Sequence, residues 1–291
     1  PDGGAEDEPS QPAPAQPKPS TPPPTETRSA QREPAARPAP APAQPVNNGD
    51  SEYKVALDKL KAGLFDPAIA DFEDFLKRFP RSERVPGAYL AIAESHVGAG
   101  RIEEALAGFV EVQSRFPQAR ESAQASYRQG ELMLMSGRSD RKAQAREIFD
   151  RTATRFPNTA WAPLALMAKA SIELEEKIEV NDPVAGGRVP AAIISYRMVA
   201  ELYGSTPHAE KALARLATLY DDEKRFDLAA AAYEQLASSF PSGNGDAWWE
   251  AGQLYDRKLD DDQKAIAAYG KVPQSSRHYD AAQKRISKLS R

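Results

Sequence analysis

Few residues in this sequence have the types and spacing that catalysis or metal binding would need. The three histidines, His96, His208 and His278, lie far apart along the chain, and we expect His96 to pack within its helix. The acidic runs 221–223 and 260–262 lack the alternating oxygens, central Gly and distal Glu of a calcium loop. Because the chain has no cysteine, disulfide scaffolds, thiolate metal sites and thiol catalysis are excluded. We therefore predict no metal site and no cofactor.

The motifs of common hydrolases and nucleotide-binding enzymes are also missing. The sequence has no G-x-S-x-G elbow, no Walker loop and no H-E-x-x-H pair. Gly186-Gly187-Arg188 resembles a phosphate loop only superficially, because no Lys-Ser/Thr follows it. Adjacent carboxylates such as Glu103 and Glu104 point apart on a helix, so they indicate an exposed face. We predict that the protein is not an enzyme and that it acts by binding.

Charge and hydropathy narrow the class of partner. The chain has 38 basic and 42 acidic side chains, a balance that gives no electrostatic footprint for nucleic acid. It contains no run of about 18 apolar residues, so we expect no membrane-spanning helix. Other proteins are the partners that remain.

Composition divides the chain at about residue 50. Residues 1–50 hold 14 of the 25 prolines and no aromatic residue. With almost no apolar surface to bury, we expect this segment to be a disordered Pro/Ala-rich linker, extended as polyproline II. It acts either as a solvated spacer or as a docking motif for a proline-reading domain. Residues 51–291 carry all the aromatic residues and are long enough for a sizeable core.

A repeat runs through residues 51–291. Six alanines each have an aromatic residue four positions later, and in five of the six cases another aromatic residue follows after seven more positions. Four of these second aromatic residues directly precede Pro. The six pairs are Ala68/Phe72, Ala105/Phe109, Ala145/Phe149, Ala192/Tyr196, Ala229/Tyr233 and Ala265/Tyr269, and the second aromatic residues are Phe79, Phe116, Phe156, Tyr203 and Phe240.

The spacing of the repeat has a physical reading. Residues i and i+4 share one helix face, so the small Ala admits a neighbouring helix and the ring fills the space beside it. The Pro disfavours helical backbone at the residue before it, so each of these helices ends there. Another apolar helical run precedes each pair, which makes a helix–turn–helix unit that must stack on its neighbours. We predict an all-α solenoid of about six units, closed by a capping helix at Tyr279–Leu289.

These units resemble tetratricopeptide repeats. The first helix of that family reads W-x-x-L-G-x-x-Y, and its positions match Trp248, Ala251, Gly252 and Tyr255. The resemblance covers about residues 52–273. It implies a right-handed α-solenoid with a groove lined by the first helices, which holds an extended peptide or a partner helix.

Family groove positions carry over to six residues of this chain. They form a candidate partner-binding groove, for which a solvated helix face is the alternative. The unit around residue 90 lacks the Lys and Asn of the family's carboxylate clamp, which argues against recognition of cytosolic chaperone tails. The six residues are Leu90, Glu94, Tyr127, Glu131, Lys211 and Thr218.

The longest spacing between units, 47 residues, places an insertion at about residues 179–190. Its run of Asn, Asp, Pro and Gly predicts a loop between the two helices of the fourth unit. Because extra loop length costs little free energy, the insertion is either neutral drift or a partner-contact loop. In the second case Asp182, Pro183 and Arg188 are the candidate contact residues.

A narrower resemblance is carried by the first unit. Its aromatic and small residues from Tyr53 to Phe79-Pro80 are similar to those of tetratricopeptide repeat proteins of the bacterial envelope, the CpoB-like and BamD-like groups. This resemblance implies a periplasmic scaffold that coordinates outer-membrane and cell-wall machinery. The alternatives are a BamD-like role in outer-membrane protein assembly, with a lipidated residue upstream of Pro1, or a subunit of a larger secretion or motility apparatus.

Overall fold

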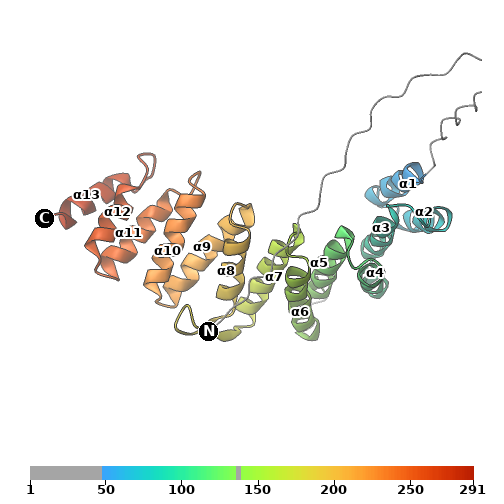
Figure 1. The fold of residues 1–291 in the computed structure, drawn as a ribbon, viewed down its shortest axis with the longest axis horizontal. Helices are drawn as coiled ribbons and strands as arrows, with labels where there is room; N and C mark the ends of the chain where they lie inside the picture. Colours follow the sequence, from blue (N-terminus) through green and yellow to red (C-terminus); the bar gives the residue numbers. More distant parts are fainter. Residues whose placement is uncertain (1–47, 136–138) are drawn as a thin grey trace, which may run out of the picture. The chain divides into compact units, whose positions relative to one another are not determined.

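The computed structural model describes residues 48–135 and 139–291, and most of the predicted linker at 1–50 lies outside them. The described residues form thirteen helices and one pair of strands (Figure 1). The elements are α1 (Asp50–Lys61), α2 (Phe65–Arg78), α3 (Val85–Gly98), α4 (Ile102–Arg115), α5 (Arg120–Met135), α6 (Ser139–Arg155), α7 (Trp161–Glu175), β1 (Glu179–Asp182), β2 (Gly187–Pro190), α8 (Ala192–Leu202), α9 (Pro207–Asp222), α10 (Phe226–Ser239), α11 (Asp246–Arg257), α12 (Asp262–Gly270) and α13 (Tyr279–Leu289).

Each helix packs against the helix before it and the helix after it. The first helices of successive units, from α1 through α3, α5 and α7 to α9, also contact one another. The twelve helices α1–α12 therefore make six stacked pairs, and α13 packs on α12 as the cap. This confirms the predicted all-α solenoid of helix–turn–helix units.

The repeated Ala and aromatic pairs form the centre of every unit. All six alanines are completely buried, and Phe72, Phe109, Phe149 and Tyr269 are buried with them. Burying one such ring contributes about 1.5–3 kcal/mol relative to leaving it in water. Because every unit repeats the same contact between a small Ala and a large ring, the core forms a series of clusters along the array.

The second helices end where the sequence predicts. Phe79, Phe116 and Phe240 are the C-cap residues of α2, α4 and α10, with φ between −127° and −132°. The following Pro excludes the helical conformation at each of these positions. The three rings are half-buried, and those of Phe79 and Phe116 pack on Phe75 and Tyr89 of their own units.

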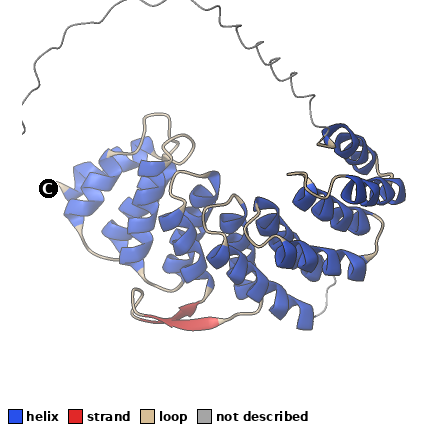
Figure 2. Cartoon of the chain, turned by 45° about the vertical axis from the view of Figure 1, so that its right-hand side comes forward, coloured by secondary structure: helices blue, strands red, loops and turns tan. Residues whose placement is uncertain are grey.

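The insertion differs from the predicted loop because it is a β-hairpin (red in Figure 2). β1 and β2 pair antiparallel, with Val180 opposite Val189. The four-residue turn closes through a hydrogen bond from the Gly186 N–H to the Asp182 carbonyl oxygen (2.9 Å), and Gly186 has the positive φ that such a turn needs (72°). Val189 is buried against the helices, which fixes one face of the hairpin to the core.

Candidate functional site

A groove of about 830 Å³ opens on the first helices of the amino-terminal units. Its walls come from α1, α3, the first turns of α5 and the turn that leads into α7. We call it the first-helix groove. Its apolar lining residues are Tyr53, Leu57, Leu60, Leu90, Ala91 and Trp161, and its polar ones are Glu94, Arg120, Glu121, Gln124, Asn158 and Thr159.

Helix α1 supplies the apolar wall. Tyr53, Leu57 and Leu60 follow the i, i+4, i+7 spacing, which places them on one face. The Tyr53 ring lies edge-on to Phe72, with centroids 5.5 Å apart, so α2 fixes its orientation. Gly87 on α3 leaves room for the Tyr53 hydroxyl, since a Cβ there would lie 2.7 Å from that oxygen. The wall is therefore held in place before any partner arrives.

An arginine between two carboxylates joins α3 to α5 beside the groove. Arg128 donates from Nε and Nη2 to the two oxygens of Glu94 (2.8 and 2.9 Å), and from Nη1 to Glu131 (2.8 Å). These hydrogen bonds raise the pKa of Arg128 above its usual value, and those to Glu94 have the larger effect. All three guanidinium nitrogens are thus occupied by carboxylates of this chain.

The second acidic residue that lines the groove is also paired. Arg120 Nε lies 3.0 Å from Glu121 Oε1, and the side chain of Arg120 is 84% exposed while that of Glu121 is 19% exposed. Glu94 and Glu121 are the carboxylates that line the groove, so each has an arginine of this chain beside it.

Tyr127 supports Trp161, which lines the α7 side of the groove. Its ring packs against Phe149 and Trp161, with centroid distances of 5.5 and 5.3 Å. Burial, together with the Glu131 carboxylate, raises the pKa of Tyr127 to about 12, so its phenol stays neutral at physiological pH. Tyr127 therefore fixes Trp161, which in turn lines the groove.

The six predicted groove residues fall into three positions. Leu90 and Glu94 line the first-helix groove. Tyr127 and Glu131 lie one helical turn apart on α5, behind the lining: Tyr127 contacts the lining residue Trp161, and Glu131 bonds Arg128, which in turn bonds the lining residue Glu94. The other two are exposed on α9, outside this groove, where the Thr218 hydroxyl donates to the Ala214 carbonyl oxygen (3.0 Å). Partner binding through any of the six, Lys211 included, stays a prediction.

Several lining residues were not among those predicted. The i, i+4, i+7 pattern that begins at Tyr53 is a sequence signal for the α1 wall. Asn158, Thr159 and Trp161 have no such signal, because they reach the groove only through the way successive units stack.

The hairpin is fastened to the helices by a buried ion pair. The guanidinium of Arg197 on α8 donates to both carboxylate oxygens of Asp182 (2.9 Å each), and it also bonds the Tyr220 hydroxyl on α9 (3.1 Å). These hydrogen bonds lower the pKa of Asp182. Of the predicted contact residues, Asp182 is therefore buried and engaged, whereas Pro183 and Arg188 are exposed.

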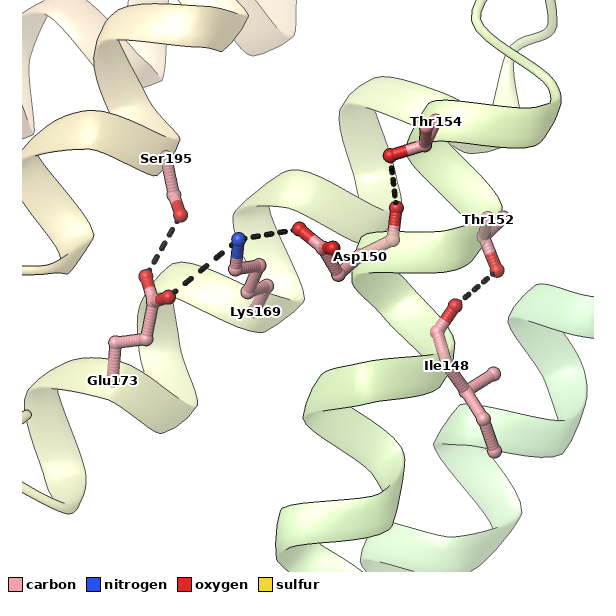
Figure 3. Close-up of polar contacts among 7 residues, drawn as sticks. All are labelled: Ile148, Asp150, Thr152, Thr154, Lys169, Glu173 and Ser195. Atoms are coloured by element: carbon pink, nitrogen blue, oxygen red, sulfur yellow. Dashed lines mark hydrogen bonds and ion pairs between the residues drawn. The ribbon is translucent and has the colours of Figure 1, made fainter.

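A second polar network lies between α6, α7 and α8 (Figure 3). The Lys169 ammonium lies 2.5 Å from Asp150 Oδ1 and 3.7 Å from Glu173 Oε1. Glu173 is buried, and its other oxygen accepts a hydrogen bond from the Ser195 hydroxyl (2.7 Å). Each charged group in the network thus has an internal partner, which gives it a structural role in joining three helices.

The histidines do not converge on a common site. His96 Nδ1 accepts a hydrogen bond from Arg101 Nε (2.9 Å), and burial lowers the pKa of His96. The His278 ring stacks on Trp249 with centroids 5.1 Å apart. Within residues 48–135 and 139–291, no group of three or more His, Asp or Glu residues is arranged to hold a metal ion. In the same residues no helix is both long and apolar enough to cross a membrane.

The stacked helix pairs and the groove on their first helices define a repeat scaffold of the helical solenoid class. The sequence matches the tetratricopeptide repeat family over residues 53–107, 90–160 and 214–277, which together make up more than half of the chain. The chain therefore belongs to the tetratricopeptide repeat family. Members of this family are generally non-catalytic scaffolds that bind other proteins.

Solved structures with a similar fold come from several organisms. A tetratricopeptide repeat protein from Parabacteroides merdae is 11% identical, with 84% of this chain and 100% of that chain covered and a TM-score of 0.45. PilF from Pseudomonas aeruginosa is 15% identical, with 82% and 97% covered and a TM-score of 0.45. The TPR2AB domain of yeast Sti1, in complex with pHSP90, is 16% identical, with 83% of each chain covered and a TM-score of 0.37. A search of curated proteins gave no match.

Proposed function

We propose that this protein is a non-catalytic scaffold of the bacterial cell envelope, which binds a segment of another protein in its first-helix groove. The observation that carries the binding role is the groove itself. It presents preformed apolar side chains from α1 and α3 to solvent, next to polar groups from α5 and the turn before α7, of which the charged ones, Arg120 and Glu121, pair with each other. A groove of this composition suits a peptide or a helix of a partner protein.

The binding role is tested with one groove variant and one matched control. Leu57→Glu places a charge on the apolar wall at a partly exposed position, so the array should still fold. Val110→Glu makes the same chemical change on α4, at a residue that is 50% exposed and outside the groove. Proteins crosslinked to the full chain should be lost with Leu57→Glu and retained with Val110→Glu. Equal recovery with both variants would remove the groove from the proposal.

The envelope location is supported by the resemblance of the first unit to envelope repeat proteins and by the absence of thiols, which suits an oxidising compartment. The role that follows is coordination of outer-membrane and cell-wall machinery. The BamD-like alternative places the chain at the outer membrane, attached through a lipidated residue upstream of Pro1. A third role is that of a subunit in a secretion or motility apparatus.

Crosslinking in intact cells, followed by purification and mass spectrometry, separates these roles. Recovery of Tol–Pal components or cell-wall synthases supports the coordinator. Recovery of the barrel-assembly complex supports the BamD-like role instead. If only cytosolic or motility components were recovered, the envelope coordinator would be wrong. Each result counts only where Leu57→Glu abolishes it and Val110→Glu does not.

A further inference from the structure

We infer that the segment bound in the first-helix groove is uncharged and enters with aliphatic or aromatic side chains, so that recognition does not use a charged tail. The inference rests on the proposed function, because it names the chemistry of the partner at that same site. The carrying observation is the juxtaposition of an apolar wall with arginines and carboxylates that already satisfy one another.

The charged side chains at the groove bond one another, with one arginine shared by two carboxylates. Glu94 receives two hydrogen bonds from Arg128, and the remaining nitrogen of that guanidinium bonds Glu131. A partner carboxylate that approached Arg128 would therefore have to displace a carboxylate of this chain. It would lose its own hydration shell and gain no new counter-charge.

Arg120 is the cation among the described residues that line the groove, and its position gives little discrimination between charged partners. Its side chain is 84% exposed and lies beside Glu121, so water and that carboxylate both screen it. An exposed ion pair at the rim of a site contributes little to affinity and is weakened further by salt. Neither an acidic nor a basic partner finds an unopposed charge among these lining residues.

The apolar wall, unlike the paired charges, offers a partner a surface to bind. Tyr53, Leu57 and Leu60 lie in a row on α1, and Trp161 faces the groove from the start of α7. The rings of Tyr53 and Trp161 are each packed against other aromatic residues, so ordering them on binding costs little entropy. Rigid aromatic side chains and partly exposed leucines are the surface on which an apolar anchor gains most.

The polar rim completes the match to an uncharged segment. Gln124, Asn158 and Thr159 offer amide and hydroxyl groups, which pair with backbone or with uncharged side chains. A segment with an apolar side towards α1 and a neutral polar side towards α5 would leave none of these groups unpaired. A charged side chain placed there would exchange water for these neutral dipoles, since the two charges that line the groove from α5, Arg120 and Glu121, already pair with each other.

The test selects peptides by their dependence on the groove. A displayed library of random twelve-residue peptides is selected on the immobilised full chain and counter-selected on the Leu57→Glu variant. Circular dichroism confirms that this variant keeps its helices. The expected peptides are enriched in Leu, Phe, Trp and Met, and depleted in Asp, Glu, Lys and Arg relative to the unselected library.

Synthetic copies of the selected peptides are then titrated calorimetrically. Between 0.05 and 0.5 M NaCl, Kd should change by less than about threefold, because no unscreened charge is involved. Leu57→Glu should weaken binding by more than about tenfold, whereas Arg120→Gln and Val110→Glu should each change it by less than about threefold.

Two outcomes overturn the inference, and they differ in what they say about the proposed function. Groove-dependent peptides rich in acidic or basic residues, with affinity that falls tenfold or more with salt, would contradict the partner chemistry and leave the groove as a binding site. Failure to recover any peptide that depends on Leu57 would contradict both the proposed function and the inference built on it.

Discussion

The first-helix groove and the hairpin are held by different kinds of interaction. In the units that form the groove, buried alanines and aromatic rings repeat from helix to helix, and the ion pair of Arg128 with Glu94 stays partly in solvent. At the hairpin the fastening groups are charged and nearly buried: the side chain of Asp182 is 2% exposed and that of Arg197 is 17% exposed.

The two regions differ because the helix units repeat regularly and the hairpin does not. Repeated units meet through the same surfaces each time, so a small residue opposite a large one is enough to set their spacing. The hairpin interrupts the repeat and has only two four-residue strands, so its apolar contacts with the helices, such as that of Val189, are few. Directional hydrogen bonds from Arg197 to Asp182 help to set its orientation, and Arg197 is itself held by a hydrogen bond to the Tyr220 hydroxyl.

The largest expected loss of stability comes from Phe109→Ala, which tests the apolar side of the comparison. Phe109 is completely buried, so the substitution removes a ring and leaves a cavity. The free energy of unfolding should fall by about 3–5 kcal/mol. Urea unfolding followed by circular dichroism measures it. Val110→Ala, at the next and half-exposed residue, is the control and should change stability by less than about 1 kcal/mol.

Arg197→Ala tests the ion pair that fastens the hairpin. The substitution leaves the buried Asp182 carboxylate without its cation, which should cost about 3 kcal/mol. Hydrogen exchange should show the loss as faster exchange of the hairpin amides, while amides of α1–α4 stay unchanged. The double variant Asp182→Ala/Arg197→Ala should be more stable than Arg197→Ala alone. If the double variant were the less stable of the two, the ion pair would not be the fastening.

Acidification should loosen the hairpin. Because Arg197 lowers the pKa of Asp182 below the ordinary value of 3.8, the pair stabilises the folded state fully above that pH. The contribution is lost as pH falls below 3.8 through the folded pKa. The effect should be smaller than that of Arg197→Ala, since a protonated Asp182 keeps part of its hydrogen bonding. The protection of the hairpin amides, which is the intrinsic exchange rate at each pH divided by the observed rate, should fall from pH 5 to pH 2.5 in the wild type and not in Asp182→Asn.

The smallest expected effect is that of Glu94→Gln at the groove. Arg128 is 34% exposed and keeps Glu131 as its partner, so stability should fall by less than about 1 kcal/mol. The loss should shrink further in 0.5 M NaCl. A loss as large as that of Arg197→Ala would mean that the two regions are held in the same way after all. Chemical denaturation of Glu94→Gln and the wild type, without added NaCl and in 0.5 M NaCl, measures the loss.

The features that could be predicted from the sequence are those that depend on one helix at a time. The burial of Phe72 and Phe109 follows from the Ala and ring spacing, and the helix ends at Phe79 and Phe116 follow from the Pro after each. The capping helix at Tyr279–Leu289 has the predicted bounds.

The features that escaped prediction depend on pairing across the chain. The hairpin strands are too short to show alternation, and Val180 and Val189 gain meaning only when they face each other. Trp161 enters the groove because of the rotation between successive units, which the pattern of a single helix does not encode. Of the predicted groove residues, Leu90 and Glu94 line the first-helix groove and Lys211 and Thr218 lie on a different helix pair, and binding through any of them stays a prediction.

Helix α7 takes part in both regions. Its first residue, Trp161, lines the groove, Glu173 near its other end accepts a hydrogen bond from Ser195 on α8, and β1 of the hairpin begins at Glu179, shortly after α7 ends. A fifteen-residue helix is a stiff rod about 22 Å long. If α7 tilts about its middle, its two ends move in opposite directions. A displacement of the α7 end next to the hairpin would therefore displace Trp161, at the opposite end, in the opposite direction and change the shape of the groove wall.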